Sequence, residues 1–199
     1  MACGCGKRCF KRIIECVRAA SERPLHELFA AREWAEIDRR LKKEPRLALY
    51  ETRWDVGHKS KEHTGCQSIF HMSAQWDAPA EYVSGWIEVH AALEWERGTG
   101  FSSDYAGSLP LHYASLYSAQ PELVRLLFAQ SKAAIVEEGG NLWNNHPGQK
   151  NFTPLKLAEG YNTGPAKVAI VQVLKECEAE YQEELIRAEE AAGSAGRTV

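Results

Sequence analysis

Three histidines recur at similar places along the chain, and their residue type could support chemistry. His26, His71 and His112 lie in the segments RPLHEL, SIFHMS and LPLHYA. Histidine binds zinc and transfers protons near neutral pH. A shared zinc site would need ring nitrogens at about 2.0–2.1 Å from one ion. Which chemistry is open to these residues therefore depends on the elements that position them.

A second candidate for chemistry is the cysteine-rich N-terminus. Cys3, Cys5 and Cys9 stand beside four lysines and arginines between residues 7 and 12, and Cys16 follows. S-acylation next to cations would give a two-part membrane anchor. The thiols could instead hold zinc, although their C-x-C-x3-C-x6-C spacing matches no familiar zinc finger. A transit peptide and an inert capping helix are the other interpretations, and we predict no metal site.

Other patterns for catalysis or cofactor binding are missing from the sequence. The GTG segment at residues 98–100 lacks the spacing and the following Lys-Ser/Thr of a phosphate-binding loop. The net charge of −3 and the pI near 6.2 give no basic field that would hold nucleic acid. We therefore predict a chain that is not an enzyme, uses no cofactor and binds no nucleic acid.

The histidine segments belong to a repeated unit. Together with TPLKLA they place His26, His71, His112 and Lys156 at intervals of 45, 41 and 44 residues. A second apolar stripe at helical spacing follows each segment, so every unit reads as two helices joined by a turn. The second helices are predicted at residues 33–45, 79–93, 121–130 and 165–176, and the last three open with proline, which suits a first helical turn.

This pattern resembles the ankyrin repeat family, whose signature is T-P-L-H-x-A. The resemblance covers about residues 24–176, and the residues that carry it are His26, His71, Pro110, Leu111, His112, Thr153, Pro154 and Leu155. It implies that the histidine forms hydrogen bonds within and between neighbouring turns. Equivalent positions in stacked units lie roughly 10 Å apart, which excludes one shared metal site. The sequence departs from the family in its longer period and in lacking most of the glycines that close the first helix.

The expected fold is an all-α, ankyrin-type helical repeat solenoid with long inter-repeat loops and helical caps. A single helix pair cannot bury its apolar stripe, so neighbouring pairs must stack. The predicted organisation is a Cys-rich basic N-terminus and capping helix at 1–22, repeats at 23–65, 66–107, 108–150 and 151–176, and a charged C-terminal helix with a frayed tail at 177–199.

The segments between units are polar but carry large aromatic residues: Trp54, Trp95, Phe101, Tyr105 and Trp143. In the ankyrin family such segments project from one edge and commonly contact partners, and aromatic side chains are efficient anchors in interfaces. We predict these five residues as a partner-binding surface, with Phe101 and Tyr105 nearest the middle of their loop. Trp54 and Trp143 could instead fold back on helix ends, and Trp34, Trp76 and Trp86 are predicted core residues.

The predicted function is therefore non-catalytic protein–protein interaction, as an adaptor or an accessory subunit. The alternative is a membrane-tethered regulator anchored through acylated cysteines at the N-terminus. The scattered cysteines do not form a disulfide framework, which favours a cytoplasmic protein. Peripheral membrane contact through the N-terminus and organelle targeting are the alternatives for its location.

Overall fold

The computed structural model describes residues 23–49, 51–55, 64–94, 107–139 and 152–195. This part of the chain is mostly helical, in agreement with the predicted fold class. Its helices come in consecutive pairs: α2 (Leu25–Ala30) with α3 (Trp34–Lys43), α4 (Ile69–Gln75) with α5 (Ala80–Glu94), α6 (Pro110–Tyr117) with α7 (Pro121–Gln130), and α8 (Pro154–Tyr161) with α9 (Lys167–Ala195).

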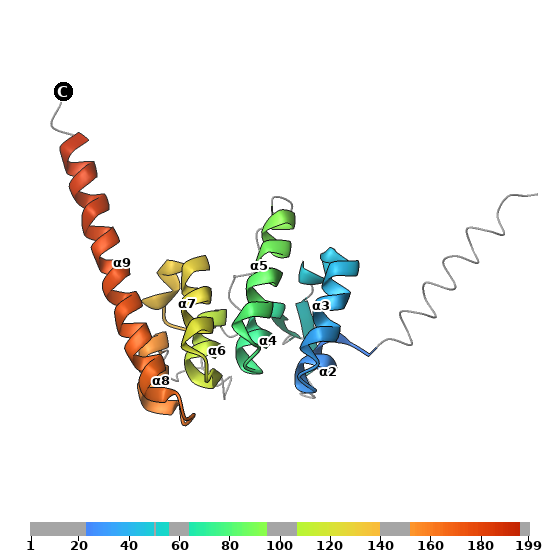
Figure 1. Cartoon of the computed structure of the whole chain (residues 1–199). Coiled ribbons are helices and arrows are strands. Elements are labelled where there is room, and N and C mark those ends of the chain that lie inside the picture. Colours follow the sequence, from blue (N-terminus) through green and yellow to red (C-terminus); the bar gives the residue numbers. More distant parts are fainter. Residues whose placement is uncertain (1–22, 50, 56–63, 95–106, 140–151, 196–199) are drawn as a thin grey trace, which may run out of the picture.

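The pairs lie side by side in chain order, as Figure 1 shows. The first helices form one row, in which α4 contacts α2 and α6, and α6 contacts α8. The second helices form another row, in which α5 contacts α3 and α7, and α7 contacts α9. Short 3₁₀ helices, η1 (Pro45–Leu49) and η2 (Lys132–Ile135), follow α3 and α7. Each inner pair therefore has a neighbour on both sides against which its apolar face is buried.

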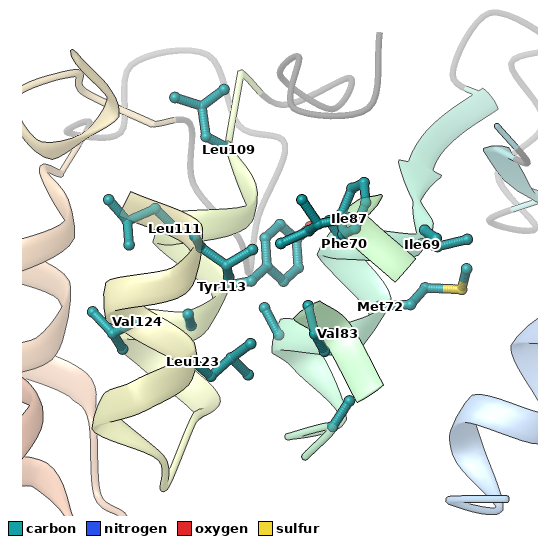
Figure 2. Packing of buried hydrophobic residues seen from close by; sticks show 14 of the residues in the cluster. Ile69, Phe70, Met72, Val83, Ile87, Leu109, Leu111, Tyr113, Leu123 and Val124 are labelled. Atoms are coloured by element: carbon teal, nitrogen blue, oxygen red, sulfur yellow. The ribbon is translucent and has the colours of Figure 1, made fainter. Parts of the chain in front are cut away.

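The buried side chains form one cluster that runs through all four pairs. Figure 2 shows Phe70 and Val83 of α4 and α5 directed toward Tyr113 and Leu123 of α6 and α7. Trp86 is 1% exposed and lies edge-to-face with a phenylalanine of α2, with ring centroids 5.8 Å apart. The prediction of Trp86 as a core residue is confirmed, while Trp34 and Trp76 are half-buried and pack against the cluster.

Proline marks the starts of several helices, as the sequence predicted. Pro110, Pro121 and Pro154 occupy the first turns of α6, α7 and α8, where their missing N–H removes no intrahelical hydrogen bond. Pro165, by contrast, precedes the first residue of α9. The helix predicted at residues 121–130 has the observed bounds of α7.

The fourth pair differs from the others in the length of its second helix. α9 is a single helix of 29 residues that runs through residue 176 and extends well past the other helices (Figure 1). Its buried side chains Ile170, Leu174 and Cys177 continue one stripe at helical spacing, so no break divides the apolar from the charged part. Lys132 pairs with Glu180 and Glu184, which ties the charged part to the body as well.

The described residues also contain one short strand pair, beside the helices that make up most of the fold. β1 (Glu51–Asp55) and β2 (Thr64–Ser68) pair antiparallel, with Glu51 opposite Ser68 and Asp55 opposite Thr64. The strands close the base of the segment predicted as the first inter-repeat loop. Their pairing joins residues far apart in sequence, and threonine and tryptophan in β1 favour extended backbone.

Two turns between paired helices adopt left-handed backbone at a residue other than glycine. Arg32 and Asp77, at the turns after α2 and α4, both have φ of 56°, in the left-handed region where glycine is usual. Left-handed backbone is unfavourable for residues with a Cβ, although aspartate and asparagine tolerate it better than most. The surroundings of Asp77 supply the compensating interactions.

The Asp77 carboxylate joins two neighbouring turns. Its Oδ1 accepts hydrogen bonds from the Ser118 hydroxyl at 2.8 Å, the Ala119 amide at 3.0 Å and the Gln120 side-chain amide at 3.2 Å. Gln120 also accepts from the Ala80 amide at 3.2 Å. This network fixes the turn of the second pair against the turn of the third.

Replacing Asp77 with alanine should lower the free energy of unfolding by about 1–2 kcal/mol, because it removes the shared acceptor from a left-handed position. Asp77→Asn is the matched control, since it keeps Oδ1 and tolerates the same backbone, and its effect should stay within about 0.5 kcal/mol. Urea unfolding of the three proteins measures both values. Equal stability of all three would show that the network contributes nothing.

Candidate functional site

His112 has both ring nitrogens engaged. It is fully buried, its Nδ1 accepts a hydrogen bond from the Leu109 amide at 3.0 Å, and its Nε2 donates to the Glu137 carbonyl at 3.0 Å. Because a backbone N–H points at Nδ1, the proton of the neutral ring resides on Nε2. Nδ1 thus caps the start of α6, and Nε2 binds the backbone at Glu137, which follows α7 and η2.

His71 repeats this arrangement in the preceding pair. Its Nδ1 accepts from the Ser68 amide at 3.2 Å and lies 2.9 Å from the Ser68 hydroxyl, while its Nε2 donates to the Ser108 carbonyl at 3.0 Å. Its ring also lies edge-to-face with Tyr113, with centroids 5.3 Å apart. The same bonds at two equivalent positions leave neither nitrogen for metal binding or proton transfer.

The first and last units differ at the histidine position. His26 is half-buried on α2, and Lys156 is exposed on α8. In place of a histidine cap, the Thr153 hydroxyl accepts a hydrogen bond from the Lys156 amide at 3.4 Å. Among the described residues, no group of three His, Cys, Asp or Glu side chains is placed to hold a metal ion.

The Nε2 hydrogen bonds of His71 and His112 lie at the ends of two predicted inter-repeat loops. Ser108, held by His71, follows the segment 95–106, and Glu137, held by His112, precedes the segment 140–151. Gly139 and Phe152 close that second segment with paired backbone hydrogen bonds of 3.1 and 3.3 Å. Both segments therefore start or end on backbone that the scaffold fixes in place.

The predicted contact residues themselves are mostly outside the described part of the chain. This applies to Trp95, Phe101, Tyr105 and Trp143, and also to the N-terminal Cys3, Cys5 and Cys9. Trp54 lies on β1, opposite Gly65 of β2. Of the repeat-motif residues, Pro110, Leu111 and Pro154 are buried, whereas Thr153 and Leu155 are half-buried at the start of α8.

Sequence reasoning missed a row of aromatic residues at the other ends of the first helices. Trp76, Tyr117 and Tyr161 each lie five residues after the histidine position of their unit, at or just after the ends of α4, α6 and α8. Tyr117 and Tyr161 are 40% and 44% exposed, and partial burial raises the pKa of the Tyr117 phenol. Aligning the units on the histidine position would have been enough to reveal this row from the sequence. Tyr161 also lies edge-to-face with Phe152, with ring centroids 5.3 Å apart.

Cys177 is a buried thiol of α9. Burial raises its pKa to about 11, so the thiol stays protonated at neutral pH and lacks the thiolate that reacts with electrophiles. Its role is to pack in the stripe that holds α9 against the body.

Comparison with known proteins gives no relative. No family model, curated protein or solved structure matches the chain. Within the described ranges, no helix is both long and apolar enough to cross a membrane.

Proposed function

We propose that this chain is an ankyrin-type helical repeat module that binds another protein along its loop edge, as an adaptor or accessory subunit without catalysis. The observation that carries the proposal is the equivalent bonding of His71 and His112. Each ties the start of its own helix pair to backbone at the base of a following loop. A rigid scaffold that fixes loop bases is what protein-binding loops commonly require.

The stacking of the helix pairs supports the same proposal. Neighbouring first helices and neighbouring second helices are in contact, and one apolar cluster runs through all pairs, as expected for a repeat array. Both titratable nitrogens of the repeated histidines serve the scaffold. The aromatic residues of the inter-repeat segments then remain the best anchors for a partner.

A Phe101→Ser/Tyr105→Ser double variant should recover far less cross-linked partner than the wild type, with little change in melting temperature. The proposed reason is that these side chains fill pockets on the partner rather than the core. Affinity capture with cross-linking from the native source, followed by mass spectrometry, measures the recovery.

Tyr117→Ser is the matched control, because Tyr117 is a 40% exposed aromatic residue at the end of α6. It should leave recovery unchanged. Equal recovery by the wild type and the double variant would refute the loop edge as the binding surface. A large loss of melting temperature in the double variant would place Phe101 and Tyr105 in the core instead.

A further inference from the structure

A groove of about 570 Å³ runs between α3 and α5, in the row of second helices. Leu41 of α3 and Tyr82, Trp86 and Val89 of α5 supply its apolar and aromatic lining. Such a surface between neighbouring helices can accept side chains of a partner. The lining residues that the structure describes all lie on α3 and α5.

Gly85 keeps this groove open. It lies inside α5 and lines the groove, and a Cβ added at this position would meet no atom within 4 Å. Glycine inside a helix is destabilising relative to alanine. The absence of a side chain here leaves room beside Tyr82 and Trp86 that no other described residue fills.

The charged residues of the groove are mostly acidic. Asp38, Glu81 and Glu88 supply three carboxylates against the single ammonium of Lys42, which lies 2.7 Å from the Asp38 carboxylate. Glu81 and Glu88 are exposed and form no ion pair with any described residue. Two carboxylates are thus left to attract cations of a ligand.

The aromatic lining also favours a cationic, partly apolar ligand. Tyr82 is half-buried at the groove, above the buried ring of Trp86, and aromatic faces attract guanidinium and ammonium groups.

We propose that the groove between α3 and α5 binds a basic, amphipathic peptide segment of a partner protein. Apolar side chains of the peptide pack against Tyr82 and beside Gly85, and its arginine or lysine side chains pair with Glu81 and Glu88. This interaction does not depend on the loop edge, so the two proposals can fail independently.

Fluorescence anisotropy of a labelled synthetic peptide, with leucine and arginine repeating at helical spacing, tests the proposal on the full chain. The wild type should bind it, and should not bind a version with glutamate in place of arginine. Gly85→Leu, which fills the groove, and Glu88→Lys, which reverses its charge, should each weaken binding at least about tenfold. Thermal unfolding verifies that both variants are folded.

Two controls make the same chemical changes elsewhere. Gly160→Leu replaces another helical glycine whose added Cβ would meet nothing within 4 Å, and Glu122→Lys reverses an exposed carboxylate at the start of α7. Both should keep the wild-type affinity within about twofold. If all four variants bind the peptide equally, or if the glutamate peptide binds as well, the proposal is wrong.

One further variant separates a partner from the chain's own basic N-terminus. Glutamine replaces four cations in the full chain: Lys7, Arg8, Lys11 and Arg12. Unchanged peptide affinity supports an external partner. At least about tenfold tighter binding would assign the groove to the N-terminal segment and overturn the proposal.

Discussion

Gly139→Ala should lower the free energy of unfolding by about 2–4 kcal/mol, through overpacking and loss of hydrogen bonds. A Cβ at residue 139 would lie 2.6, 2.7 and 2.9 Å from the Cδ2, Nε2 and Cγ atoms of His112. Such distances are too short for real contacts, so the ring must move. The ring is held at both ends by hydrogen bonds to Leu109 and Glu137, and moving it breaks at least one of them.

The strain comes from the ring rather than from the backbone, because Gly139 has no left-handed φ that alanine would find difficult. Gly85→Ala and Gly160→Ala are the matched controls, since their added methyl groups would meet nothing within 4 Å. They should leave stability unchanged or raise it by about 0.5–1 kcal/mol. Guanidinium unfolding measures all three variants. A Gly139→Ala protein as stable as these controls would refute the tight contact.

The helix pairs could be predicted because their signals are local. In α7, a proline at the first position and aliphatic residues at helical spacing are enough to predict the observed helix, Pro121–Gln130. The partner of β1 could not be predicted in the same way. Pairing Glu51 with Ser68 depends on how the chain returns to α4, which no local pattern encodes.

The candidate site was predictable only in its repeated part. Alignment of the units indicates that His71 and His112 share a role, but not that one bonds to Ser108 and the other to Glu137. The Ser108 carbonyl comes after the 95–106 segment, whereas the Glu137 carbonyl comes before the 140–151 segment. The close approach of Gly139 to His112 is likewise a tertiary contact, and its sequence signal is a single glycine among several.

His112→Ala should destabilise the protein by about 2–5 kcal/mol. The change removes a fully buried ring and leaves a cavity, and it deprives the Leu109 amide and the Glu137 carbonyl of their partner. Urea unfolding followed by circular dichroism measures the loss. Lys156→Ala changes the equivalent, exposed position of the fourth unit and should alter stability by no more than about 0.5 kcal/mol.

The double variant connects this prediction with the first. If Gly139→Ala destabilises the protein by pushing against the His112 ring, the change should matter little when His112 has already been replaced. In the His112→Ala background, Gly139→Ala should lower the free energy of unfolding by less than about 0.5 kcal/mol. The two changes then share one contact, and their combined effect falls below the sum of the separate effects. Strict additivity would mean that Gly139 acts on the fold without His112. In that case the paired backbone bonds of Gly139 with Phe152, rather than the histidine, would hold the base of the 140–151 segment.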